Sequence, residues 1–168
     1  MNGTIAYAPQ KPWIMSATLQ ENITFNLPLD KKRLDEAVRY SCLDDDLKIL
    51  DKGLETEIGE KGTNLSGGQK ARVSLARALY SNKDIYLLDD VLSAVDVHVG
   101  KFLMSETILG YLRGKTVIMP THAINYMEQA DNVVVMKKGR VVAFGTPKEI
   151  QGNEGYEEIV SIERKKSK

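Results

Sequence analysis

Short apolar runs alternate with segments of helical periodicity along this chain and predict its secondary structure. Strand-like runs lie at residues 4–8, 84–89, 115–119, 132–136 and 140–144. Helical segments are predicted from Asp30, at 44–50, from Ser66, over 96–113 and at 125–129. In the first of these, Leu34, Val38 and Cys42 are spaced to share one helix face. Strands alternating with helices predict an α/β fold with a mostly parallel sheet.

The order of these segments also predicts how the domain is organised. The helical block at about 27–80 interrupts the strands, which suggests a helical subdomain inserted into a core made of 1–26 and 81–155. Gly53 ends a helix, and the polar residues 54–64 are predicted to be loop. Lys137-Lys-Gly139 predicts a hairpin between the last two strands. The basic tail, 160–168, is expected to be solvated, and its last residues from Glu163 to be frayed.

Composition narrows the class of protein. Hydrophobic residues make up 42% and charged residues 27% of the 168 positions, as in ordinary globular domains. The formal net charge is zero, which gives no electrostatic reason to expect a nucleic-acid partner. The single cysteine excludes an intrachain disulfide and favours a reducing compartment. No apolar run approaches the roughly 18 residues of a membrane span, and the start of the sequence lacks a signal-peptide pattern.

The stretch NLSGGQKARVSLARAL (64–79) places two glycines between a serine and a helix. Ser66 and Gln69 have the spacing of a capping box, in which each side chain binds the other residue's backbone N–H. Gly67 and Gly68 each cost about 1 kcal/mol in a helix relative to alanine. That cost is reasonable where an anion must approach the N–H groups at the positive helix end. The pattern leaves helix capping and phosphate contact both open.

A strand of buried type, DIYLL (84–88), ends in the two carboxylates Asp89 and Asp90. Its end is expected at the carboxyl edge of the sheet, where ligand sites of α/β proteins lie. The first carboxylate can hold Mg²⁺, directly or through water, and the second can orient or deprotonate a water molecule. A strand followed by a polar turn is the plainer explanation of the same pair.

Three other sites carry little information by themselves. Gln10 ends the first strand, and a lone glutamine is nearly uninformative. His122 follows the strand at 115–119, where a histidine is more often structural or solvated than catalytic. The tetrapeptide SAVD (93–96) lies between a strand and a helix and fits a helix N-cap.

Taken in order, these features resemble the nucleotide-binding domain of ATP-binding-cassette (ABC) transporters. The resemblance matches Gln10 to the Q-loop glutamine, Leu65, Ser66, Gly67, Gly68 and Gln69 to the family signature, Asp89 to the Walker B aspartate, Ser93, Ala94, Val95 and Asp96 to the D-loop, and His122 to the switch histidine. APQKPWI, TLQENITF and IGEKGTNLSGGQ look most like the first such domain of the multidrug-resistance-associated subfamily. The resemblance covers about residues 3–150 and implies a partial RecA-like P-loop NTPase core with an inserted α-helical subdomain.

For the intact protein, the resemblance implies ATP hydrolysis that drives solute export, with the domain at the cytoplasmic face of a membrane. Its partners would be a second nucleotide-binding domain, paired head to tail, and a transmembrane domain docked beside Gln10 and the helical subdomain. The signature would act in trans on ATP held by the second domain. In cis, Asp89 and Gln10 would hold Mg²⁺, partly through water, Asp90 and Gln10 would place the attacking water, and His122 would stabilise charge.

Two departures from the family pattern concern the chemistry. Asp90 stands where the family usually has glutamate, which is one methylene longer. A misplacement near 1 Å can cost on the order of 10²-fold in rate, so a site that uses Asp90 should hydrolyse slowly. Aspartate is common at this place in the first domain of the subfamily, which supports the assignment. Pro120 precedes Thr121-His122, where an apolar strand residue is usual, and is expected to alter the switch loop.

The largest departure is the Walker A loop, G-x-x-x-x-G-K-[ST], which in the family precedes the Q-loop strand. The segment GYLRGKT (110–116) resembles it, but has only three residues between its glycines. It also follows a predicted helix and precedes a strand, whereas a P-loop follows a strand and opens a helix. We therefore expect a truncated domain that binds ATP poorly and is inactive as an ATPase by itself.

Two other classes of protein stay open. A soluble ABC ATPase of the chromosome-maintenance kind would separate Q-loop and signature by long coiled coils, but Gln10 and Ser66 lie 56 positions apart without sustained heptads. A nucleotide-independent binding module could keep the fold and lose the chemistry. An in-frame Walker A motif in the DNA upstream of Met1 would distinguish a transporter from such a module.

Overall fold

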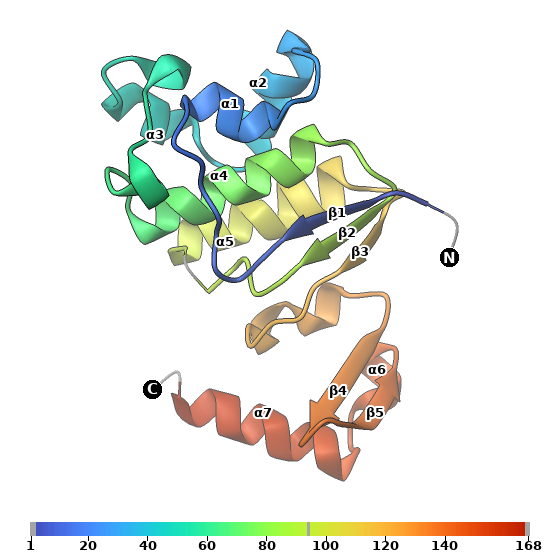
Figure 1. The fold of residues 1–168 in the computed structure, drawn as a ribbon. Coiled ribbons are helices and arrows are strands. Elements are labelled where there is room, and N and C mark those ends of the chain that lie inside the picture. The colour runs from blue at the N-terminus through green and yellow to red at the C-terminus, as the bar shows by residue number, and fades with distance from the viewer. Residues whose placement is uncertain (1–2, 94, 167–168) are drawn as a thin grey trace. The chain divides into compact units, whose positions relative to one another are not determined.

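The computed structural model describes residues 3–93 and 95–166, with side chains through residue 162. It forms two compact units, Met1–Thr121 and His122–Lys168 (Figure 1). This division differs from the core and helical subdomain expected from the sequence, and the boundaries of that subdomain stay a prediction.

The first unit is built on a three-stranded parallel sheet. Its strands are β1 (Ile5–Ala8), β2 (Ile85–Leu88) and β3 (Thr116–Ile118), with β2 in the centre. Ile5 is paired with Ile85, which is paired in turn with Thr116. The parallel pairing confirms the predicted fold class, and the helical block forms the long crossover between β1 and β2.

The crossover contains short helices around one long helix. Its elements are α1 (Leu19–Thr24), α2 (Lys31–Tyr40), α3 (Asp44–Ile49), the 3₁₀ turns η1 (Gly53–Glu55) and η2 (Glu60–Gly62), and α4 (Gly67–Tyr80). Two predictions need correction. The loop expected over 54–64 contains 3₁₀ turns, and Cys42 lies beyond the end of α2. Its φ of 60° is left-handed, so Cys42 does not continue the helix face of Leu34 and Val38.

Helix α4 packs between the sheet and the shorter helices. Val73, Ala76 and Leu79 are fully buried on it, and it contacts β1, α1 and α2. At its last residue, the Tyr80 hydroxyl donates to the Pro28 carbonyl at 2.6 Å and accepts from the Asp30 N–H at 2.8 Å. This side chain therefore fixes the point where α2 begins.

The helix predicted over 96–113 is continuous in the structure but changes its winding. It consists of α5 (Val97–Phe102) and a π-helical continuation, η3 (Leu103–Tyr111). The sequence pattern placed the helix correctly and gave no sign of the π segment.

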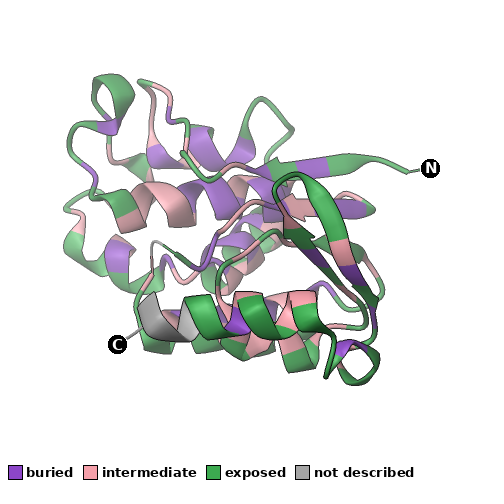
Figure 2. Cartoon of the chain, turned by 90° about the horizontal axis from the view of Figure 1, so that it is seen from below, coloured by how far each residue is buried: buried purple, intermediate pink, exposed green. Residues whose placement is uncertain are grey.

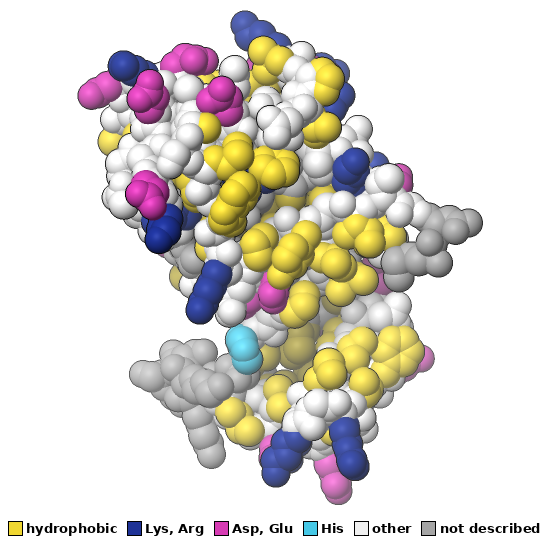
Figure 3. Space-filling model, viewed as in Figure 1, with side chains coloured by type: hydrophobic (Ala, Val, Ile, Leu, Met, Phe, Trp, Pro, Cys, Tyr) yellow, Lys and Arg dark blue, Asp and Glu magenta, His cyan; other side chains and the backbone are white. Residues whose placement is uncertain are grey.

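The two faces of the sheet are covered unequally. Ala6, Ala8 and Leu88 are buried, because α4 packs against β1 on that side (Figure 2). On the other face, Ile5, Tyr7 and Ile118 are 52%, 55% and 44% exposed. Hydrophobic side chains gather over these strands in Figure 3. An apolar surface of this kind is unusual on a free-standing domain and promotes association.

The second unit pairs a β-hairpin with helices. Its elements are η4 (Ile124–Gln129), β4 (Val133–Lys137), β5 (Arg140–Gly145), α6 (Pro147–Ile150) and α7 (Glu154–Lys166). Lys138 and Gly139 both have positive φ, which suits the tight turn between twisted antiparallel strands. Val135, Ala143 and Ile150 form its core.

The expected solvated tail is only partly observed. Helix α7 continues through Lys166, and Val160 is 5% exposed, whereas Ser161 and Ile162 are exposed. The side chains of 163–168 lie outside the described part, so their solvation stays a prediction. Tyr156 and Ile159 of α7 pack against the core of this unit.

We predict that the isolated chain self-associates through the exposed face of its parallel sheet. The double substitution Ile5→Thr and Ile118→Thr keeps β-branched residues but removes apolar surface, and should shift the chain toward monomer in sedimentation velocity. Ile49→Thr, at an exposed position on α3, is the matched control and should change nothing. A wild-type chain that remains monomeric at high concentration would contradict this prediction.

Candidate functional site

The loop after β2 is held between the ends of the two flanking strands. The Asp89 N–H donates to the Ala8 carbonyl at 2.9 Å, and the Asp90 N–H donates to the Pro120 carbonyl at the same distance. Asp90 has a φ of 51°, a left-handed conformation that aspartate tolerates better than most residues. Parallel pairing therefore places both carboxylates at the carboxyl edge of the sheet.

Three side chains of the first unit converge on these carboxylates. Gln10 Nε2 donates to Asp90 Oδ2 at 3.1 Å, and Thr121 Oγ1 lies 3.5 Å from Asp90 Oδ1. The Tyr7 hydroxyl donates to Asp89 Oδ2 at 3.4 Å. Gln10, Asp89 and Asp90 are thus brought together from positions about eighty residues apart in the chain. Tyr7 and Thr121 had no sequence signal of their own, because each depends on a partner across the sheet.

This edge offers few ligands for a metal ion. Within the described residues, no group of three or more His, Cys, Asp or Glu side chains is close enough to hold one. Mg²⁺ in nucleotide sites commonly takes one or two protein ligands and completes its shell with phosphate oxygens and water. Asp89 and the amide oxygen of Gln10 fit such a partial set of oxygen ligands.

The start of α4 forms the capping box that the sequence suggested. Ser66 Oγ accepts from the Gln69 N–H at 3.2 Å, and Gln69 Oε1 accepts from the Ser66 N–H at 2.8 Å. Leu65 is buried just before this turn. Because Ser66 Oγ acts here as an acceptor, its hydroxyl hydrogen remains available to another oxygen.

Glycine at position 67 is not required by its protein surroundings. A Cβ built on Gly67 would meet no described atom within 4 Å, and its φ is not in the left-handed region. Neither packing nor backbone conformation therefore explains Gly67, which is exposed on the surface. Close approach by a group from outside this chain is a physical reason that fits both observations.

The loop from Ser93 to Asp96 links the carboxylate edge to α5. Ser93 Oγ donates to the Asp90 carbonyl at 2.8 Å. Asp96 caps α5, where its Oδ1 accepts from the Val99 and His98 N–H groups at 3.1 and 2.8 Å. These bonds, that from Val99 foremost, lower the pKa of Asp96. Val95 is half-buried, and Ala94 lies outside the described residues.

The predicted switch residue His122 begins the second unit. Its side chain is exposed, and its carbonyl accepts from the Ile124 N–H at 2.9 Å. Its catalytic role stays a prediction. The rejected phosphate loop at 110–116 does run from η3 into β3, from helix to strand, which confirms that it lacks the order of a P-loop.

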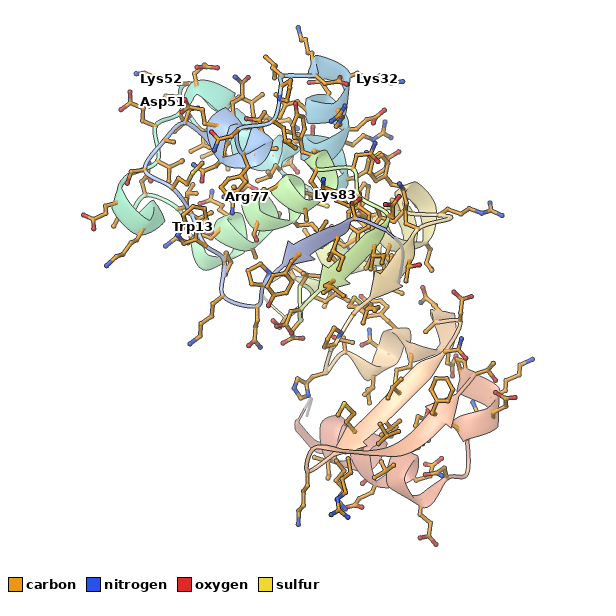
Figure 4. The ribbon with its side chains drawn as sticks, turned by 45° about the vertical axis from the view of Figure 1, so that its right-hand side comes forward. Trp13, Lys32, Asp51, Lys52, Arg77 and Lys83 are labelled. Carbon is orange, nitrogen blue, oxygen red and sulfur yellow. The ribbon has the colours of Figure 1, made fainter. Side chains whose placement is uncertain are left out.

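Arg77 is an organising residue that the sequence analysis missed. Its Nε donates to the Asn22 carbonyl at 2.7 Å, and a terminal nitrogen donates to the Trp13 carbonyl at 2.9 Å. The guanidinium carbon also lies 5.3 Å from the Trp13 ring centroid and 5.1 Å from that of Phe25. Figure 4 shows Arg77 on α4 and Trp13 on the segment that follows Gln10.

The burial of this guanidinium lowers the pKa of Arg77. Its hydrogen bonds and aromatic contacts compensate for the loss of water around the charge. Arg77 thereby joins α4 to two segments more than fifty positions earlier: α1 and the loop that contains Gln10 and Trp13, which we call the Gln10 loop. Only the tertiary structure reveals this role, because no local pattern specifies where the partners lie.

Comparisons with known proteins find relatives over most of the chain. Residues 1–93 match the family described as ABC transporter. The chain is 55% identical over 148 residues to Multidrug resistance protein mrp-7 of Caenorhabditis elegans, and the aligned region covers 87% of this chain and 10% of the relative. It is 51% identical over 146 residues to ABC transporter C family member 12 of Dictyostelium discoideum, covering 87% and 11%. A Multidrug resistance protein of Leishmania tarentolae is 53% identical over 145 residues, covering 84% and 9%.

The chain therefore spans about a tenth of the length of these relatives. Across the part of the chain that the structure describes, none of the helices has the length and apolar character needed to span a bilayer.

We predict that Arg77→Met loosens the contact between the Gln10 loop and α4. The carbonyls of Trp13 and Asn22 would lose a charged donor, so the free energy of unfolding should fall by about 2 kcal/mol or more. Trp13 is the single tryptophan, and its fluorescence should become more accessible to acrylamide. Arg113→Met, at an exposed position, is the matched control. Unchanged quenching and stability in Arg77→Met would rule out this anchoring role.

Proposed function

The chain belongs to the ABC transporter family, and from this premise we propose that it is part of a nucleotide-binding domain whose ATP hydrolysis drives solute export. The relatives to which it is similar include proteins named Multidrug resistance protein. The observation that carries the proposal is the Gln10–Asp90 hydrogen bond of 3.1 Å beside Asp89 at the carboxyl edge of the sheet. Gln10 and Asp90, which would orient the attacking water, thus lie next to Asp89, which would bind the metal ion.

In the proposed reaction, water attacks the γ-phosphate in line with the leaving oxygen. One carboxylate oxygen of Asp90 accepts a hydrogen bond from this water, while Gln10 and Thr121 hold the carboxylate in place. Asp89 and Gln10 would hold Mg²⁺, which when bound supplies positive charge beside the phosphate oxygens. His122 would donate a hydrogen bond to the γ-phosphate.

The signature would act on a nucleotide held by a second nucleotide-binding domain, paired head to tail. Ser66 keeps its hydroxyl hydrogen for a phosphate oxygen, because its Oγ accepts from the Gln69 N–H. Gly67 leaves the start of α4 open to an approaching anion. The positive end of the helix and its unpaired first N–H groups favour such contact. The capping box and phosphate contact are therefore compatible uses of one motif.

The surface proposed for the transmembrane partner includes Trp13, which follows Gln10 by three positions. Trp13, Phe25, Leu27 and Leu29 are 56%, 42%, 38% and 61% exposed, and we call them the aromatic patch. The Trp13 and Phe25 rings meet edge to face with centroids 5.8 Å apart. Because Arg77 holds both rings, force on this patch would reach α4. The location would be the cytoplasmic face of the membrane, where ATP is available.

We predict that the isolated chain binds Mg-ATP weakly or not at all. Its sequence contains no G-x-x-x-x-G-K-[ST] motif, whose backbone N–H groups and lysine provide much of the phosphate contact. Isothermal titration calorimetry should detect no micromolar binding. The control is a longer form that includes a Walker A motif, tested alongside its Lys→Ala variant. Micromolar affinity in the chain alone would contradict the prediction.

We further predict that Asp90→Glu speeds single-turnover hydrolysis in the full-length protein, at the site built with this domain's own nucleotide. Glutamate brings the carboxylate one methylene closer to water, so the gain could approach about 10²-fold. The partner site must be disabled for this measurement. Some stability should be lost, because glutamate tolerates the left-handed conformation of Asp90 less well.

Pro120→Val tests whether the switch loop also limits this site. If Pro120 holds His122 away from the phosphate, Asp90→Glu should gain little until both residues are changed, because groups that act together are not additive. Rates equal to wild type in Asp90→Glu, Pro120→Val and the double variant would show that neither position limits the chemistry.

A further inference from the structure

Helix α3 begins with three consecutive aspartates, and only the third is buried. Asp44 and Asp45 are exposed, whereas Asp46 is 8% exposed. A carboxylate removed from water requires compensating hydrogen bonds or opposite charge. Its partners both lie on α4, within the first two turns after the signature serine.

Asp46 is held by two side chains of α4. Arg72 forms a two-pronged ion pair with it, with Nε 2.7 Å from Oδ2 and a terminal nitrogen 2.9 Å from Oδ1. Gln69 Nε2 donates to Oδ1 at 3.2 Å. The side chain of Arg72 is 16% exposed, so this pair is shielded from solvent.

The carboxylate dictates which way the Gln69 carboxamide points. An ionised carboxylate can only accept hydrogen bonds, so it must face the Gln69 NH₂ group. The amide oxygen is then turned toward the Ser66 N–H, from which it accepts at 2.8 Å. A carboxamide turned the other way would set a donor against the Ser66 donor and break the capping box.

We propose that Asp46 is a positioning residue for the signature: fixed by Arg72, it orients Gln69 and thereby holds Ser66 and the first turn of α4 ready for a phosphate. This inference rests on the proposed function, in which the signature contacts a nucleotide across the domain pair. It gives the helical block a specific part in the reaction, since Asp46 of α3 contacts the side chain of Gln69 in the signature.

If Asp46 only stabilised the fold, substitutions at this site would have different effects. A buried ion pair adds little to stability compared with well-packed apolar residues. Packing alone would be insensitive to which of the two side chains carries the amide. Orientation of Gln69, in contrast, requires an acceptor on one side chain facing a donor on the other.

The test separates the acceptor at position 46 from its charge. Gln69 Nε2 and a terminal Arg72 nitrogen both donate to Asp46 Oδ1, so in Asp46→Asn the amide oxygen takes this place and still holds the Gln69 carboxamide. Asp46→Leu has a similar size but offers no acceptor, so it releases the Gln69 NH₂ group. Gln69→Glu places two carboxylates face to face, which is unfavourable.

Hydrolysis is measured by single turnover in the full-length protein at the composite site that uses this signature. Asp46→Leu and Gln69→Glu should each lose roughly tenfold or more, whereas Asp46→Asn should keep most of the wild-type rate. The KM for ATP at this domain's own nucleotide site should not change. Asp45→Asn, on the exposed neighbour, is the matched control and should behave as wild type.

A second readout follows the structure of the chain itself. The backbone amide of Ser66 and the side-chain amide of Gln69 should lose their hydrogen-bonded NMR signatures in Asp46→Leu and keep them in Asp46→Asn. If Asp46→Leu or Gln69→Glu fails to fold, Asp46→Asn decides the matter by keeping both hydrolysis and the Ser66 signature or not.

The outcomes separate the two hypotheses. A full-length wild-type protein that hydrolyses no ATP would overturn the proposed function. A wild type that hydrolyses ATP, with full activity in Asp46→Leu and Gln69→Glu or with Asp46→Asn as impaired as Asp46→Leu, would overturn the role of Asp46 and leave the proposed function intact.

Discussion

Burial of helix α4 is the constraint on which the rest of the first unit depends. Val73, Ala76 and Leu79 have no exposed surface, and the helix contacts β1 as well as α1 and α2. Removing that much apolar surface from water is the main favourable contribution to folding. Because the helix is fixed along its whole length, groups at its two ends are fixed relative to each other.

Two arginines connect this buried helix to other segments of the first unit. Near its start, Arg72 holds the Asp46 carboxylate and with it the orientation of Gln69. Near its end, Arg77 holds the Trp13 carbonyl and packs against the rings of the aromatic patch. A shift of α4 would therefore change both the signature and the Gln10 loop, the two parts that must respond to one another if transport is coupled to hydrolysis.

The exposed sheet face and the capping box show which features follow from local sequence patterns and which depend on tertiary contacts. The structure shows that α4 covers one face of β1 while Ile5 and Tyr7 remain exposed on the other. The Ser66 and Gln69 spacing predicts a cap, and the structure contains it. The open space around Gly67, which supports the proposed phosphate contact, cannot be read from the spacing.

The sequence by itself determined the fold class, the approximate extent of the strands and of most helices in the first unit, and the family, because these follow from periodicity, capping residues and contiguous motifs. It missed the end of α2 before Cys42, the π winding of η3 and the helices α6 and α7. Only the tertiary structure decided that Gln10 contacts Asp90, that Asp46 supports Gln69 and that Arg77 joins Trp13 to α4. The physical reason is that each of these contacts joins residues at least twenty positions apart, and their geometry depends on how buried apolar surfaces pack rather than on neighbouring residues in the chain.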